Sequence, residues 1–168
     1  MIRTVHVGRA DAADAAELAG LAAQTFPLAC PPTATPENIA SFVDANLSAE
    51  RFAEYLADPH RALLTATLSG RIIGYAMLVG DATDDAAELS KIYVLPEYHG
   101  GGASTALMAA ALAAAEGRGA RRVWLGVNRA NERAQRFYAK SGFRISGTRT
   151  FQLGAGLEHD YVMVRELG

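Results

Sequence analysis

The stretch from residue 88 to residue 117 constrains the fold of this 168-residue chain more than any other. It contains an unbroken apolar run, Ile92 to Leu95, whose β-branched and aromatic residues are typical of a buried strand. Pro96 interrupts that strand because it has no backbone donor, and the glycines 100–102 follow closely. From Ser104 onward nearly every residue is Ala, Leu or Met, which are strong helix formers. The predicted order is therefore strand, glycine turn and helix.

This order suits the binding of an anion. The first turn of a helix has backbone N–H groups without intrahelical partners, and glycines let a ligand approach them closely. A P-loop is excluded because no lysine follows the glycines. A dinucleotide fingerprint is excluded because Thr105 stands at the third glycine position and Arg121-Arg122-Val123 where the acid is required. An ordinary glycine turn before a surface helix and a phosphate site of another kind remain as alternatives.

Composition and charge argue against several other classes. The net charge of −2 does not suggest a nucleic-acid partner, and no apolar run is long enough to span a bilayer. Met1 is followed by strand-like residues rather than a signal peptide. Cys30 is the only cysteine, so the chain has no internal disulfide, which is consistent with a cytoplasmic location. Cys30 is a weak candidate for a nucleophile. No cluster of ligand residues has metal-binding spacing, so no metal is expected.

Periodicity and turn residues predict one mixed-sheet α/β domain over residues 1–168. Helices are predicted after Asp11 or Asp14, ending at Pro27, and at 35–47, 48–56, 104–117 and 131–141. Ser69-Gly70 predicts a tight hairpin. The residues from Asp81 to Asp85 predict an acidic loop, which is either solvated or attracts a polycation. Strands are predicted at 2–7, 62–68, 72–79, 92–95, 122–127, 143–151 and 159–164, the last two around the loop 154–156.

Two motifs in this order resemble those of the GNAT superfamily of N-acetyltransferases. The first is Y-V-L-P-E-Y-H-G-G-G-A-S at 93–104, similar to V-x-P-x-[YF] followed by [QR]-x-x-G-x-[GA], with His99 and Ser104 as departures. The second is N-x-x-A-x-x-F-Y-x-K-x-G-F at 131–143. The resemblance implies a GNAT-type domain, with a mixed and mostly antiparallel sheet flanked by helices. It also implies an acetyl-CoA-dependent N-acetyltransferase.

A narrower resemblance concerns the acceptor. With Phe151, Gly154 and the late run Asp160 to Met163, the chain resembles bacterial Pai-type spermidine/spermine N-acetyltransferases. It departs from them at Asn128-Arg129, where Trp or Glu is usual. The resemblance implies a small-molecule primary amine, with a polyamine as the first candidate and a homodimer as a possible assembly. An amino acid, an antibiotic or a protein N-terminus is the alternative acceptor, and a non-catalytic acyl-CoA-binding module is the alternative function.

The GNAT resemblance also implies residue roles. The pantetheine arm of coenzyme A would pair with Val94, and the Ile92 N–H would hold the acetyl carbonyl and then its oxyanion. Tyr138 would protonate the departing thiolate or simply pack in the core. Because the pKa of a phenol is ~10 and that of a thiol is ~8.5, this proton transfer is uphill by about 2 kcal/mol. Glu88, four residues before Ile92 and expected on the same face, is the candidate base or a solvated carboxylate. The coenzyme-binding residues implied are Ile92, Val94, His99, Gly100, Gly101, Gly102, Ala103, Ser104, Asn131 (also a helix cap) and Tyr138.

Overall fold

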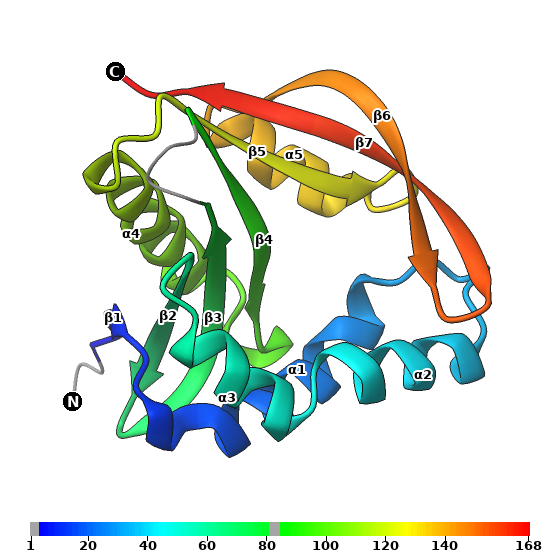
Figure 1. Cartoon of the computed structure of the whole chain (residues 1–168), viewed down its shortest axis with the longest axis horizontal. Coiled ribbons are helices and arrows are strands. Elements are labelled where there is room, and N and C mark those ends of the chain that lie inside the picture. The colour runs from blue at the N-terminus through cyan, green and yellow to red at the C-terminus, as the bar shows by residue number, and fades with distance from the viewer. Residues whose placement is uncertain (1–3, 81–84) are drawn as a thin grey trace.

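The computed structural model describes residues 4–80 and 85–168, which form a seven-stranded sheet flanked by helices (Figure 1). The strand order is β1-β2-β3-β4-β5-β7-β6, and only the β4–β5 pair is parallel. This confirms the predicted fold class, a mixed and mostly antiparallel sheet. Ile2 of the predicted first strand, and Asp81 and Asp84 of the predicted acidic loop, lie outside the described residues. The strands are β1 His6–Arg9, β2 Arg61–Leu68, β3 Arg71–Val79, β4 Ala86–Val94, β5 Arg122–Asn128, β6 Arg144–Leu153 and β7 Gly156–Glu166.

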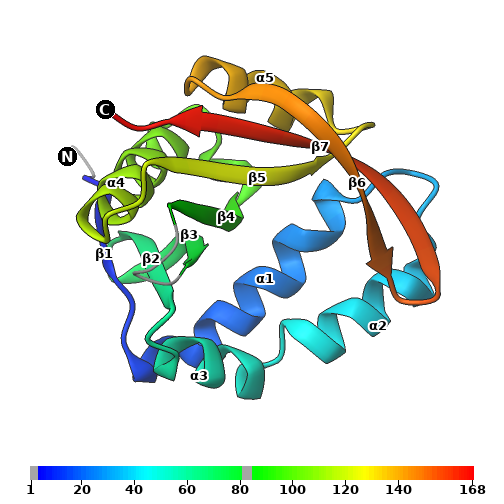
Figure 2. The ribbon, with the colours of Figure 1, turned by 45° about the horizontal axis from the view of Figure 1, so that its top comes forward.

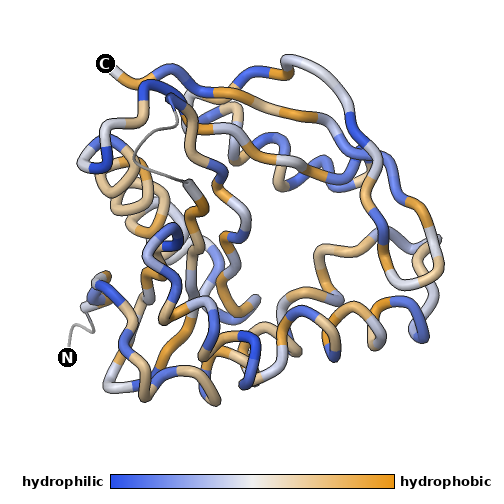
Figure 3. Tube along the Cα trace, viewed as in Figure 1, coloured by the Kyte–Doolittle hydropathy of each residue, from blue (hydrophilic) through white to orange (hydrophobic). Residues whose placement is uncertain are grey.

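Helices cover both faces of the central strands. Tyr75 of β3 packs against Phe52 of helix α3 (Ala49–Ala57), with 5.7 Å between the ring centroids. The neighbouring Gly74 faces Leu107 of helix α4 (Ala103–Gly117). Because successive strand residues point to opposite faces, α3 and α4 lie on opposite sides of the sheet. Figure 3 shows apolar residues concentrated in the central strands and in α4.

The N-terminal helices are capped as predicted, but the first one ends later. Asp11 accepts a hydrogen bond from the Ala13 N–H and begins a 3-10 turn, Ala12–Asp14, that leads into α1 (Ala15–Ala29). The prediction that Pro27 ends this helix is wrong. A proline near a helix C-terminus removes only one intrahelical bond, and the Cys30 N–H closes the last turn on the Pro27 carbonyl at 3.3 Å. Leu28 and Ala29 thereby belong to the last turn of α1, and Cys30 is its C-cap.

Helix α2 (Pro36–Asn46) lies beside the tip of the β6–β7 hairpin. Its N-cap, Thr35, accepts from the Asn38 N–H at 3.1 Å, as predicted, and Ser48 caps α3 in the same way. The Asn38 side chain in turn accepts a hydrogen bond from the Ala155 N–H, also at 3.1 Å. This contact joins parts of the chain that are far apart in sequence, and Figure 2 shows the hairpin curving toward α2.

Several strands differ in length from their predicted ranges. β1 begins at His6 and ends at Arg9, because its pairing with β2 continues to Arg9 opposite Leu64. β6 and β7 extend to a two-residue turn at 154–155, beyond the predicted ends. Residues 144–148 are all exposed, whereas toward the turn Phe151 and the buried Leu153 alternate with the exposed Thr150 and Gln152, so the strand pattern continues past the predicted end at Phe151. The hairpin at Ser69-Gly70 is confirmed, with φ values of 52° and 79°.

Strand β4 carries a bulge that changes which residues share a face. Met77 of β3 pairs with Lys91, but the next residue, Leu78, pairs with Leu89, so Ser90 is the extra residue. The prediction that Glu88 and Ile92 share a face is therefore wrong. Glu88 instead lies on the same face as Lys91 and Tyr93, whereas Ile92 lies on the face of the buried Leu89.

Candidate active site

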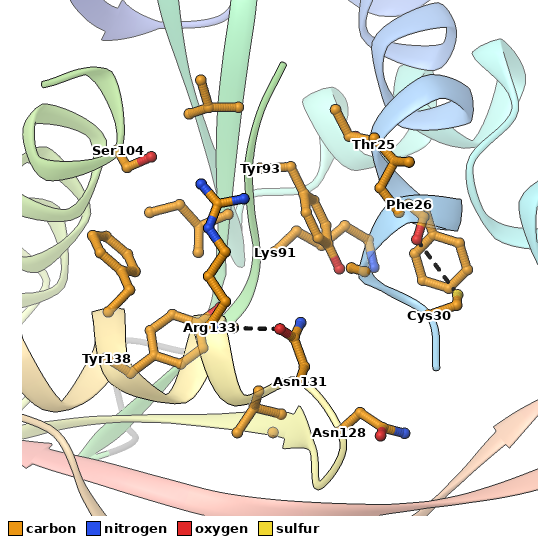
Figure 4. Close-up of a pocket in the computed structure, with 18 of the residues that line it drawn as sticks. Thr25, Phe26, Cys30, Lys91, Tyr93, Ser104, Asn128, Asn131, Arg133 and Tyr138 are labelled. Carbon is orange, nitrogen blue, oxygen red and sulfur yellow. Dashed lines mark hydrogen bonds between the residues drawn. The ribbon is translucent and has the colours of Figure 1, made fainter. Parts of the chain in front are cut away.

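Strands β4 and β5 diverge and open the main cleft of the molecule. They pair only from Ala86 opposite Arg122 to Glu88 opposite Trp124. Beyond that point the cleft, of about 1010 Å³, is bordered by α4 and helix α5 (Glu132–Lys140) on one side of β4. We call this the α4–α5 side, and the part lined by α1, α2 and the β6–β7 hairpin the α1–α2 side. Figure 4 shows Ser104, Arg133 and Tyr138 on the former, Thr25, Phe26 and Cys30 on the latter, with Tyr93 and Lys91 between them.

The glycine turn leaves backbone donors at the start of α4. Gly102 is the N-cap with φ of 88°, a left-handed conformation that glycine adopts without strain. The first intrahelical bond runs from the Ala106 N–H to the Gly102 carbonyl at 2.9 Å, so the amides of the first turn, including Ser104, have no intrahelical acceptor. The start of α4 is therefore suited to hold an anion without a basic side chain.

Not every predicted residue of the turn is available to the cleft. The His99 N–H donates to Pro96 and the Gly101 N–H to Tyr98, so both amides are already used inside the turn. Gly101 and Ala103 line a second pocket of about 250 Å³ rather than the cleft. The other predicted residues all line the cleft: Glu88, Ile92, Val94, His99, Gly100, Gly102, Ser104, Asn131 and Tyr138.

The His99 side chain joins β4 to α5. Its Nε2 lies 2.8 Å from the Val94 carbonyl oxygen, and its Nδ1 contacts the guanidinium of Arg133. A guanidinium only donates, so Nδ1 accepts and Nε2–H donates to Val94. From the sequence, His99 was a departure from the family motif and an implied coenzyme-binding residue, and this contact was not predicted.

The backbone of Ile92 and Val94 faces the open gap. The Leu95 N–H donates to the Ile73 carbonyl at 2.9 Å across the antiparallel β3–β4 ladder. Bonded and non-bonded pairs alternate in such a ladder, so Ile92 and Val94 direct their N–H and C=O groups away from β3. The contact between Val94 and His99 agrees with this direction.

Helix α5 places Asn131 and Tyr138 on the rim of the cleft. Asn131 caps the helix as predicted, accepting from the Ala134 N–H at 3.2 Å. The Tyr138 ring packs between Phe137 and Phe143, at centroid distances of 5.6 and 6.0 Å. Burial raises the pKa of Tyr138 to about 12. Because the pKa of a thiol is ~8.5, donation of the Tyr138 proton to the thiolate is then uphill by about 3.5 pKa units, or about 5 kcal/mol. This exceeds the value of about 2 kcal/mol expected from unshifted pKa values.

On the α1–α2 side, Arg149 of β6 binds two carboxylates. Its Nε lies 3.1 Å from Asp160, a buried residue of β7, and its Nη1 lies 3.8 Å from Glu88. The guanidinium passes directly over Gly126, where a Cβ atom would collide with it. Glu88 therefore lies where β4 and β5 separate and is one of two carboxylates that share a cation.

Burial shifts the pKa values of Lys91, which borders this side, and of Cys30 at the end of α1. Burial lowers the pKa of Lys91 to about 8, although the nearby Glu88 acts in the opposite direction. Burial, and then the negative charge of Glu158, raise the pKa of Cys30 to about 11. The thiol donates to the Phe26 carbonyl at 3.4 Å. Cys30 is therefore a protonated thiol at neutral pH and not a thiolate nucleophile.

Three phenylalanine rings form a continuous wall on the α1–α2 side. Phe26 of α1 stacks on Phe42 of α2 at 4.7 Å, and Phe42 contacts Phe151 of β6 at 5.3 Å. All three rings line the cleft. Sequence reasoning missed this wall, together with Lys91 and Arg149; the available signal was a lysine directly before the apolar run 92–95.

Two negative findings concern only the residues that the structure describes. Among residues 4–80 and 85–168, no group of three or more His, Cys, Asp or Glu side chains is arranged to hold a metal ion. None of the helices in these two ranges is long and apolar enough to cross a membrane.

Comparison with known proteins identifies the family of this chain and with it the class of enzyme. A model of the acetyltransferase (GNAT) family matches residues 26–143, so the chain belongs to that family. The chain is accordingly an acetyl-CoA-dependent N-acetyltransferase, with acetyl-CoA as its co-substrate.

Relatives and solved structures agree with this assignment. Uncharacterized N-acetyltransferases of Mycobacterium bovis and Mycobacterium tuberculosis are 69% identical over 155 residues, covering 92% of this chain and 98% of theirs. The PaiA N-acetyltransferase of Thermoplasma acidophilum, solved with coenzyme A, aligns with a TM-score of 0.85 at 21% identity, over 98% of this chain and 99% of that one. A GCN5-related N-acetyltransferase of Rhodopseudomonas palustris aligns with a TM-score of 0.80 at 23% identity, over 99% of both chains. At these identities the two structures support the fold.

Proposed function

We propose that this enzyme acetylates a primary amine by direct attack on acetyl-CoA, with both substrates bound at once. The observation that carries the proposal is the open edge of β4. The N–H of Ile92 points into the gap between β4 and β5, with Glu88 where the strands separate and Tyr138 on the rim. An acyl transfer needs an oxyanion donor, a base and an acid, and these three groups supply them in one cleft.

Each residue has a defined role in this proposal. The start of α4 binds the pyrophosphate of coenzyme A, and Val94 pairs with the pantetheine arm. The Ile92 N–H stabilises the oxyanion as the amine nitrogen bonds to the acetyl carbon, and one such donor contributes about 3 kcal/mol. The carbon–sulfur bond then breaks, Tyr138 donates its proton to the sulfur, and the second proton that leaves the nitrogen as the amide forms restores the phenol of Tyr138. Asn131 contacts the coenzyme in addition to capping α5.

Glu88 accepts the proton of the amine through water. An aliphatic amine with a pKa near ~10.4 is protonated at neutral pH and must lose a proton before it attacks. Glu88 and Ile92 are separated by up to about 13 Å of strand and lie on opposite faces, so the carboxylate does not reach the amine directly. A short chain of water molecules in the cleft connects them.

Two alternatives are less well supported. An acyl-enzyme on Cys30 is disfavoured because the buried thiol, with a pKa of about 11, is protonated. A non-catalytic acyl-CoA-binding module needs neither Glu88 nor Tyr138, and both line the cleft. The cytoplasmic location, the single domain over 1–168 and the homodimer stay predictions from the sequence.

The experiment that tests this proposal compares different acceptor amines. The sequence resemblance makes a polyamine the first candidate, with an amino acid, an antibiotic or a protein N-terminus as alternatives. Release of free thiol from acetyl-CoA is measured with spermidine, spermine and a panel of other primary amines. Acetyl-CoA binding is measured in parallel by calorimetry. Turnover with any primary amine supports the proposal, whereas binding without turnover across the panel contradicts it.

A further inference from the structure

We infer that the acceptor is an arylalkylamine, in which one primary amine is joined by a short alkyl chain to an aromatic ring. The inference rests on the proposed transfer to a primary amine and names the class of that amine. Its basis is the combination of an aromatic wall and paired charges on the α1–α2 side of the cleft.

The wall offers a surface for an aromatic ring. Phe42 is stacked on Phe26 with an angle of 15° between the ring planes, and Phe151 is tilted against Phe42 at 56°. Phe42 and Phe151 are only partly buried by the protein itself, and both face the cleft. Leu28, which is 66% exposed, extends this apolar surface at the rim. An aromatic substrate would bury this surface and gain offset or edge-to-face ring contacts.

The carboxylates of the same side already have protein partners. Arg149 binds both Asp160 and Glu88, and the Asn128 side chain donates to Glu158 at 3.3 Å. Glu88 is the more weakly held of the two carboxylates on Arg149, because its 3.8 Å contact is longer than the 3.1 Å contact of Asp160. Glu88 is therefore the carboxylate that is more readily released from Arg149 to accept the proton of one amine through the proposed water chain.

Two cations stand against the same wall. The Lys91 ammonium lies 5.8 Å from the centre of the Phe42 ring, and the Arg149 guanidinium lies 5.8 Å from that of Phe151. The second and third ammonium groups of a polyamine would approach these like charges and be repelled by them. An acceptor with a single amine and an apolar body avoids that repulsion.

The first test compares acceptors at saturating acetyl-CoA. We expect kcat/KM to be at least tenfold higher for 2-phenylethylamine than for spermidine, with n-butylamine between them because it has the amine but no ring. A kcat/KM for spermidine at or above that of 2-phenylethylamine would overturn the inference and leave the proposed function standing. Absence of turnover with all amines, while acetyl-CoA binds, would instead contradict the proposed function.

The second test removes the wall. Phe151→Ala is expected to lower kcat/KM for 2-phenylethylamine about tenfold and to leave n-butylamine and the acetyl-CoA dissociation constant unchanged. Phe151→Leu keeps apolar volume, so it separates loss of the ring from loss of folding. Leu157→Ala is the matched control, since Leu157 is 55% exposed on the same hairpin and does not line the cleft. Equal losses for 2-phenylethylamine and n-butylamine in both Phe151 variants would overturn the inference.

Discussion

The two sides of the cleft are built in different ways. The α4–α5 side comes from two continuous segments, residues 94–105 and 131–140, and its proposed ligand contacts are largely backbone N–H groups at the start of α4. The α1–α2 side gathers side chains from α1, α2, β4, β6 and β7. A site made of backbone needs a particular local conformation, which a short motif specifies. A site made of distant side chains needs a tertiary arrangement that no short motif contains.

The chemistry of the two sides differs in the same way. Helix N-termini bind the same phosphate group in many sequences, because the donors belong to the peptide unit. The α1–α2 side instead combines an Arg149–Asp160 ion pair, a desolvated lysine and a phenylalanine wall. Each substitution in the cleft is therefore expected to change either the use of acetyl-CoA or the use of the acceptor.

The largest effect is expected from Tyr138→Phe. Loss of the phenolic proton removes the proposed general acid, so kcat should fall by about a hundredfold or more. The ring remains packed between Phe137 and Phe143, so the dissociation constant of acetyl-CoA should stay unchanged in calorimetry. A kcat within a factor of about three of the wild type would show that Tyr138 only packs and that water protonates the thiolate.

The next effect is expected from Glu88→Gln. Removing the proposed base should lower kcat/KM for the amine by roughly ten- to a hundredfold and abolish the acid limb of its pH–rate profile. Glu158→Gln is a matched control, because it also removes a carboxylate from the α1–α2 side of the cleft. If the profile of Glu88→Gln keeps its acid limb, Glu88 is not the base.

The contrast between the sides also explains what the sequence predicted. The strand, the glycine turn, α4 and the Asn131 cap were found because each depends on local chemistry: apolar runs, left-handed glycines and a capping amide. The fold class followed from the order of these elements. The ends of β6 and β7 were missed because the pairing of these two strands, which continues to Leu153 opposite Gly156, decides where they end.

The errors at the site have tertiary causes. The bulge at Ser90 reversed the expected relation between Glu88 and Ile92, and only the pairing with β3 reveals it. Arg149 meets Glu88 because β6 returns beside β7, across a sequence separation of about sixty residues. Pro27 was taken as a helix end because its local preference is strong, yet the last turn of α1 continues past it to form part of the cleft.

A smaller effect is expected from His99→Ala on the α4–α5 side. In the structure the imidazole donates to the Val94 carbonyl, where the pantetheine arm is proposed to pair. That bond must break before the coenzyme pairs there, at a net cost of about 1 kcal/mol. The substitution should therefore tighten acetyl-CoA binding about fivefold in calorimetry, without changing the KM of the amine. Weaker binding would show that the imidazole contacts the coenzyme itself.

The smallest effect is expected from Lys91→Met on the α1–α2 side, measured as stability rather than activity. Burial lowers the pKa of Lys91 from 10.5 to about 8, so the folded protein releases this proton more readily than the unfolded chain does. The resulting destabilisation is fully present below pH 8 and fades as the pH rises from about 8 to 10.5.

Methionine keeps the length of the side chain without the charge, so at pH 7 it should raise the free energy of unfolding by about 0.5–1 kcal/mol. In chemical denaturation this gain should shrink between pH 8 and pH 10.5. Lys140→Met, which alters an exposed lysine on the α4–α5 side, should change stability by no more than about 0.5 kcal/mol and show no such pH dependence. A gain for Lys91→Met that is independent of pH would show improved packing rather than a desolvated charge.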